Sequence, residues 1–127
     1  MALVNTWFFT RTIVDWDKFA NATGNQYRVV SSRPYADKKG ILPNGISYTL
    51  QVIKDSFDYG KDKNGNEREN NEMQNFDVTV LNRNHPAKKG DIIQLLDFDS
   101  DHSYAIGFDL LLRFNDIKVL ASAKTNA

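Results

Sequence analysis

The chain has 127 residues, enough for one domain that buries a core without disulfides or a structural metal. It contains no cysteine, which excludes a disulfide scaffold and thiolate zinc or iron sites and permits a reducing cytoplasm. Sixteen basic residues balance sixteen acidic ones, so no strong overall field attracts nucleic acid or anionic lipid.

The charge is unevenly distributed along the chain. Residues 28–63 carry seven Lys and Arg against four Asp, a net charge of +3, whereas residues 91–116 carry one Arg against six Asp, a net charge of −5. If the chain binds a polyanion, the first of these regions is the expected contact. No apolar run approaches the roughly 20 residues of a membrane span, and the first residues lack an export signal. We therefore expect a soluble, cytoplasmic protein.

The N-terminal third mixes strand, helix and loop signals. Residues 3–14 are apolar enough for a strand, with Trp7, Phe9 and Ile13 on one side. The sequence DWDKFANATG predicts a short helix that ends at Gly24. Residues 31–45 contain two prolines and two glycines, which predicts an ordered loop.

Strand signals dominate from residue 46 onward. Between residues 46 and 52 every second residue is apolar, and the apolar set then moves to the other parity at Ile53, Phe57 and Tyr59. Such a phase slip predicts one long strand, residues 46–59, with a bulge. Further strands are predicted in MQNFDVTVLN, DIIQLLDF, YAIGFDLLLRF and DIKVLA, with a turn at HPAKKGD and a frayed tail, residues 122–127. The sum is a mainly β chain of five or six strands with little helix.

The most polar run is DYGKDKNGNEREN, residues 58–70. An EF-hand register that places Gly65 at the required glycine puts Gly60 and Asn71 at the first and last ligand positions, where Asp and Glu are needed. The metal interpretation therefore fails at its strongest ligands. Asn64 and Gly65 instead predict a type I′ hairpin turn at the tip of a long β-ribbon. A ribbon of this kind can also close over an extended ligand.

Signals for catalysis are weak. Asp97, Asp99 and Asp101 share one parity and suggest either a divalent-metal site or, more simply, a turn. His85 and His102 are isolated, and we expect them to be loop residues without a chemical role. We found no GxSxG motif, no P-loop and no acid/base pair, so we expect a binding protein without a cofactor rather than an enzyme.

Aromatic residues make up 12% of the chain, and most of them are expected in the core. Three flank the polar ribbon and are candidates for contact with a ligand: Phe57, Tyr59 and Phe76. Exposed rings at such a position make a platform on which unpaired bases stack, at about 1–3 kcal/mol per base.

The order of these elements resembles the OB-fold of single-stranded DNA-binding proteins. The resemblance covers residues 46–121: a long first strand, a protruding ribbon, NFDVTVLN, a KKGD turn, IIQLL and a last pair that ends in FNDIKVL. It implies a five-stranded barrel with a long β-hairpin, preceded by an N-terminal extension, residues 1–45, that supplies an extra strand or an arm that docks on a neighbouring subunit. The tail ASAKTNA lacks the acidic, aromatic-ended tip with which housekeeping members recruit repair partners.

The resemblance also implies a ligand and the residues that contact it. The ligand is single-stranded DNA, or RNA, coated without sequence preference by a homo-oligomer or an array along the strand. Phe57, Tyr59 and Phe76 are the stacking candidates, and the candidates for phosphate contact are Lys54, Lys61, Lys63 and Arg68. The variation is similar to the divergent single-strand binders of conjugative plasmids and phages.

Two alternatives stay open at this point. The first is a structural or adaptor protein of a phage or mobile element, in which the ribbon and the N-terminal extension bind protein. The second is a metal-dependent nuclease that uses Asp97, Asp99 and Asp101.

Overall fold

The computed structural model describes residues 3–6, 13–81, 87–106 and 109–122 of the chain, and for Ile106 and Asp109 the backbone alone. The described elements are α1 (Trp16–Thr23), β1 (Tyr27–Tyr35), β2 (Gly45–Val52), β3 (Asn75–Leu81), β4 (Ile92–Phe98), β5 (Tyr104–Ile106) and β6 (Asp109–Ala121). The expected mainly β chain with little helix is confirmed. Trp7 and Phe9 of the strand predicted for residues 3–14 lie outside the described residues, as do His85 and most of the tail.

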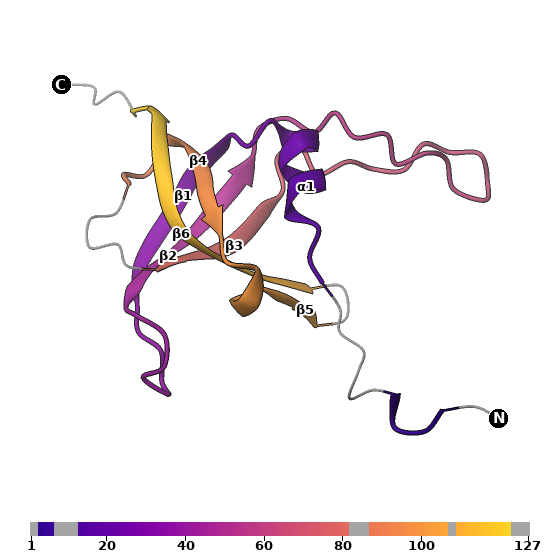
Figure 1. The fold of residues 1–127 in the computed structure, drawn as a ribbon. Helices are drawn as coiled ribbons and strands as arrows, with labels where there is room; N and C mark the ends of the chain where they lie inside the picture. Colours follow the sequence, from indigo (N-terminus) through magenta and orange to yellow (C-terminus); the bar gives the residue numbers. More distant parts are fainter. Residues whose placement is uncertain (1–2, 7–12, 82–86, 107–108, 123–127) are drawn as a thin grey trace.

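Five of the strands form a closed barrel (Figure 1). The strand order is β3-β2-β1-β4-β6, and the barrel closes where residues 78–80 of β3 run parallel to residues 112–114 of β6. All other neighbours are antiparallel, and β5 adds a short strand to the free end of β6. The expected OB-like five-stranded barrel is confirmed, and its extra strand is β5 rather than a strand of the N-terminal residues.

The barrel core comes from the alternate residues of its strands that point inward. In β3 the apolar residues Phe76, Val78 and Val80 alternate with Asp77 and Thr79, as predicted. Val78 and Val80 are fully buried. The buried side chains with the least exposure include Tyr27, Val29, Tyr48, Leu50, Val52, Ile93, Leu95 and Phe114.

The expected boundary at residue 46 between an N-terminal extension and the barrel is wrong. Residues 27–35 are β1, which lies between β2 and β4 and therefore belongs to the barrel. An irregularity that the sequence did not predict lies in β1, where the register with β2 shifts between Val29 and Ser31. Pro34 is tolerated in β1 because β4 pairs only with Tyr27 and Arg28, which leaves the far half of that edge without a ladder.

The long strand predicted for residues 46–59 ends at Val52 instead. Beyond that point local partners replace the ladder: Ser56 N–H donates to the Ala22 carbonyl of α1, and Phe57 N–H donates to the Asp55 carboxylate. Periodicity did not reveal this because the apolar residues after Val52 pack beside α1 rather than on a sheet face. Two strands were predicted at the C-terminal end, in YAIGFDLLLRF and in DIKVLA. In the structure residues 109–121, which span the end of the first and all of the second, are one 13-residue strand.

Helix α1 begins and ends as the sequence predicts. The Asp15 side chain accepts a hydrogen bond from Lys18 N–H, and Gly24 adopts a left-handed conformation with φ of 69°. The helix packs Trp16 edge-on against Phe114 at 4.7 Å between ring centroids, and so lies against the barrel core. Among the described residues, helices are too short or too polar to cross a lipid bilayer.

Candidate functional site

Residues 53–74, here called the ribbon, leave β2 and return to β3 as a long projecting arm (Figure 1). Near its tip a single β-bridge joins Lys61 to Glu67. The tip turn is closed by Gly65 N–H, which donates to the Asp62 carbonyl at 3.0 Å, and the Asp62 carboxylate accepts from Asn64 N–H and Asn66 N–H. The polar run is therefore a turn, as expected.

The type of turn differs from the prediction. A type I′ turn requires positive φ at two successive central residues, but in this tip only Gly65, with φ of 81°, is left-handed. The hydrogen bond from Gly65 to Asp62 makes Gly65 the last residue of a type I turn. The Asp62 side chain favours this geometry because it caps the turn, an effect that the Asn-Gly pair alone does not show.

The base of the ribbon is organised around Asp55, a buried carboxylate. Its two oxygens accept hydrogen bonds from the Tyr59 hydroxyl at 2.7 Å, Asn71 N–H at 2.8 Å and Phe57 N–H at 3.1 Å. The Asn71 side chain donates to the same Tyr59 hydroxyl at 3.0 Å. One carboxylate thus ties the outgoing and returning halves of the ribbon together.

These contacts set the ionisation of the pair. Burial raises the pKa of Asp55, but the hydrogen bonds from Tyr59, Asn71 and Phe57 outweigh burial and leave the pKa below its ordinary value. Burial and the neighbouring Asp55 carboxylate raise the pKa of Tyr59. At neutral pH the carboxylate is therefore charged and the phenol keeps its proton.

Two of the predicted stacking residues meet at this base. The rings of Phe57 and Tyr59 contact edge to face, with centroids 4.8 Å apart, and Phe57 remains 37% exposed. Lys18 of α1 places its Nζ 5.0 Å from the centroid of the Phe57 ring, a cation–π contact. An exposed ring and a neighbouring positive charge therefore share one surface.

The third predicted aromatic, Phe76, has a different environment. Its ring contacts Tyr27 at 5.1 Å and Phe19 at 5.7 Å, both edge to face, and its side chain is half-buried against the core. Phe76 therefore forms part of the floor of a surface hollow rather than a projecting ring.

Three adjoining hollows lie between α1, the ribbon base, β3, β6 and the end of β1. The first, of about 450 Å³, lies between α1 and the ribbon base and is lined by Phe57, Tyr59, Phe19 and Leu110 among others. The second, of about 650 Å³, lies over β3 and shares Phe19, Tyr59 and Leu110 with the first. The third, of about 460 Å³, reaches the end of β1 and shares Leu110 and Leu112 with the second. We call the three together the wall groove.

The predicted phosphate contacts are spread out. All four basic side chains are exposed: Lys54, Lys61, Lys63 and Arg68. Of these, Lys61 and Arg68 line a hollow beside the ribbon. The Arg68 guanidinium donates to the Tyr59 carbonyl at 2.9 Å and so fastens the ribbon itself. Over residues 53–74 these four basic residues face six acidic ones, a net charge of −2. The ribbon is therefore not a basic arm.

Sequence reasoning missed the residues of α1 and β6 that line the groove. Lys18 and Phe19 lie on a correctly predicted helix, but nothing in that helix indicates that it packs beside the ribbon. Leu110 has the same parity as the buried Leu112 and Phe114, yet its side chain is 49% exposed at the groove. It lies near the start of β6, before the barrel closes at residues 112–114, and the sequence alone does not show where this closure occurs.

The acidic run before β5 forms a turn, as expected. Asp99 caps a short 3-10 turn, Ser100–His102, and its carboxylate lies 2.7 Å from His102 Nδ1. The described part of the chain contains no group of three or more His, Cys, Asp or Glu side chains placed to hold a metal ion.

Comparison with models of known protein families, with curated proteins and with solved structures gives no match to this chain. The structure itself defines a fold class. The protein is an OB-like barrel with a projecting ribbon and with the wall groove, which is lined in part by aromatic side chains.

Proposed function

We propose that this protein binds single-stranded DNA, largely without sequence preference, along the wall groove. The observation that carries the proposal is the exposed Phe57 ring, held against Tyr59 and next to Lys18 where the groove begins. Every base has a flat face, so stacking on such rings tolerates any sequence and requires unpaired bases. OB-type barrels commonly use this kind of surface for oligonucleotides.

The proposed mechanism requires no cofactor and no catalytic residue. One base stacks on Phe57, and the following bases lie over the floor that Tyr59 and Phe76 provide. The balanced charge of the chain makes stacking the larger contribution and predicts a weaker salt dependence than that of a strongly basic protein. Coating of a strand by many copies, in plasmid conjugation or phage replication, is the biological setting that we propose.

The first prediction tests the stacking residue directly. Phe57→Ala should weaken binding to a fluorescent oligo-dT by roughly fivefold to 150-fold, because each base that no longer stacks loses about 1–3 kcal/mol. The measurement is a titration at two salt concentrations, with a duplex of equal length as competitor.

A matched control is Leu120→Ala. Its side chain has a similar exposure, 40%, and lies near the end of β6, whereas Leu110 of the groove lies near the start of that strand. It should bind as the parent does. Equal affinities of the Phe57→Ala variant and the parent would remove this ring from the site, and duplex competition as strong as that of the single strand would reject the proposed ligand.

A second candidate function is favoured by one observation. The first hollow is bordered by exposed apolar side chains, Ile13 at 70% and Leu110 at 49%, in addition to the aromatic pair. Such a border also suits an apolar segment of a protein partner, as in an adaptor of a phage or mobile element. This alternative predicts self-association in sedimentation experiments and no shift of oligo-dT at low salt.

A further inference from the structure

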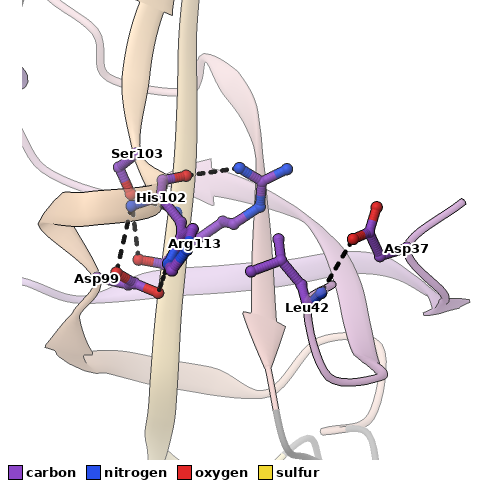
Figure 2. A network of polar contacts seen from close by, with 6 residues as sticks. All are labelled: Asp37, Leu42, Asp99, His102, Ser103 and Arg113. Carbon is purple, nitrogen blue, oxygen red and sulfur yellow. Dashed lines mark hydrogen bonds and ion pairs between the residues drawn. The ribbon is translucent and has the colours of Figure 1, made fainter. Parts of the chain in front are cut away.

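Arg113 lies at the seam where the barrel closes. It stands opposite Thr79 in the parallel pairing of β3 with β6. Its backbone is fixed on both sides, because its N–H donates to Ser103 Oγ at 2.9 Å and its carbonyl accepts from Asp99 N–H at 2.9 Å. One guanidinium nitrogen, Nη1, donates to the His102 carbonyl, as Figure 2 shows.

A second nitrogen of this guanidinium, Nε, has no hydrogen-bond partner among the described residues. Nε of Arg113 is buried without a hydrogen-bond acceptor, and no carboxylate among the described residues lies within ion-pair distance of the side chain. The nearby acids are engaged elsewhere: Asp99 with His102, and Asp37 with the backbone N–H groups of the loop after β1 (Figure 2). A buried donor without an acceptor is unfavourable, so such a group normally finds its acceptor in ordered water or in a bound ligand.

The positive charge of Arg113 influences the pKa of Asp37, although the two side chains form no ion pair in the described part of the chain. The hydrogen bond from Leu42 N–H is the largest cause that holds the pKa of Asp37 below its ordinary value, and the positive charge of Arg113 adds to it. The Asp37 carboxylate also accepts from Lys39 N–H and Ile41 N–H, which commits it to the loop backbone. The hydrogen bonds of the Asp37 carboxylate among the described residues therefore come from the loop backbone and not from Arg113.

The third hollow of the wall groove brings a second arginine to the same place. Arg33 of β1 is exposed and lines this hollow together with Arg113, Tyr35 and Thr79. Asp77 is the acidic residue of its lining, so the two arginines leave the lining with one net positive charge. The Asp77 carboxylate already accepts a hydrogen bond from the Thr49 hydroxyl at 2.7 Å.

The charge distribution agrees with this location. The ribbon carries a net charge of −2, whereas residues 28–39, which include Arg33, carry four basic residues against one Asp, a net charge of +3. A polyanion that enters at the aromatic pair therefore finds its positive charge at the other end of the groove. The two ends are linked because Leu110 lines all three hollows and Leu112 lines the second and third.

We infer that Arg113 and Arg33 form a phosphate-binding subsite for the backbone of the same single strand whose bases stack at Phe57. This inference rests on the proposed function and adds the direction of the strand across the barrel wall, from the ribbon base toward β1. Arginine suits the role because its planar fork pairs with two oxygens of one phosphate.

The test compares Arg33→Gln and Arg113→Gln with Arg28→Gln. Arg28 is a matched control because it is an exposed arginine of the same strand that does not line the third hollow and that donates instead to Gln51. Two labelled probes of equal length are used: oligo-dT, and an abasic phosphodiester chain that has no bases. Binding is measured over a series of salt concentrations.

We expect each of the two site variants to bind both probes more weakly than the parent. The slope of log K against log salt should fall by about 0.7 for each phosphate that the variant no longer binds. Arg28→Gln should keep the parental slope, and Phe57→Ala should weaken oligo-dT alone. The Arg33 side chain is exposed and makes no hydrogen bond to another described side chain, so its variant remains informative even if Arg113→Gln disturbs the chain near His102.

Two results would overturn the subsite. The first is equal slopes for Arg33→Gln, Arg113→Gln and Arg28→Gln. The second is failure of the parent to bind the abasic chain. Weaker binding of the abasic chain by the arginine variants, with no effect of Phe57→Ala on oligo-dT, would retain the subsite and reject the stacking proposal.

Discussion

Asp55 shows how one side chain decides the shape of a whole segment. The residue lies where the sequence predicts a continuing strand, yet its carboxylate accepts the Phe57 N–H, the Asn71 N–H and the Tyr59 hydroxyl. A short acidic side chain that captures nearby backbone donors competes with a β-ladder. The chain therefore leaves the sheet, and the aromatic pair takes its position at the groove.

Substitution of Asp55 should be pH-dependent in a defined direction. Its folded pKa is lowered, so the stability it contributes is present above the unfolded pKa of about 3.9 and is lost as the pH falls through the folded value. Asp55→Asn should therefore reduce the free energy of unfolding by about 1–3 kcal/mol at pH 7. Urea unfolding of parent and variant at pH 7 and pH 3 measures this difference.

The difference between the two proteins should shrink at the lower pH, because the parental carboxylate is then partly protonated. Glu69→Gln, an exposed acid of the same ribbon, is the control and should change little at either pH. A deficit of Asp55→Asn that is as large at pH 3 as at pH 7 would show that the charge of Asp55 is not what holds the ribbon base.

Strand pairing is decided at a larger scale, by how closely backbones approach. Gly45 begins β2 opposite Leu81 of β3, and a Cβ at this position would lie 2.8 Å from the Leu81 Cα. The neighbouring atoms belong to the backbone of β3, so they cannot move aside as a side chain would. The sequence NGIS suggests only a loop glycine, whereas the element needs glycine for space.

Gly45→Ala should therefore destabilise the β2–β3 pair, by about 1–3 kcal/mol, as overpacking in a close contact does. Gly40→Ala serves as the comparison: a Cβ there meets nothing within 4 Å, although φ of 65° adds some strain. Thermal unfolding monitored by circular dichroism measures both. A Gly45→Ala variant that melts no lower than Gly40→Ala would contradict the close approach of these strands.

At the scale of the whole molecule, β1 is the element that the sequence interpretation placed outside the barrel. It pairs with β2 over most of its length and joins β4 through Tyr27 and Arg28, and the Tyr27 ring is fully buried. Without it, β2 and β4 have no shared neighbour and the barrel cannot close.

A chain that starts at residue 46 should therefore fail to fold cooperatively. The expected result is a circular dichroism spectrum without a sharp thermal transition, and amide resonances with little dispersion. If residues 1–45 were an arm docked on a finished barrel, the shortened chain would melt in one sharp transition, and that outcome would reject the barrel boundary described above.

The sequence alone determined the fold class, the helix ending at Gly24, the strand of β3 and the turn between Lys88 and Asp91. These features depend on period, on capping residues and on glycine in left-handed conformations, which are local properties. The sequence also singled out Phe57, Tyr59 and Phe76, because aromatic residues beside a polar ribbon form a visible local pattern.

Tertiary structure alone decided the membership of β1 in the barrel, the end of β2 at Val52, and the meeting of Lys18 with Phe57. It also decided that Arg33 and Arg113, 80 residues apart in the chain, line one hollow. The physical reason is that strand pairing and charge proximity arise from barrel closure, which brings together residues whose local sequences carry no record of each other.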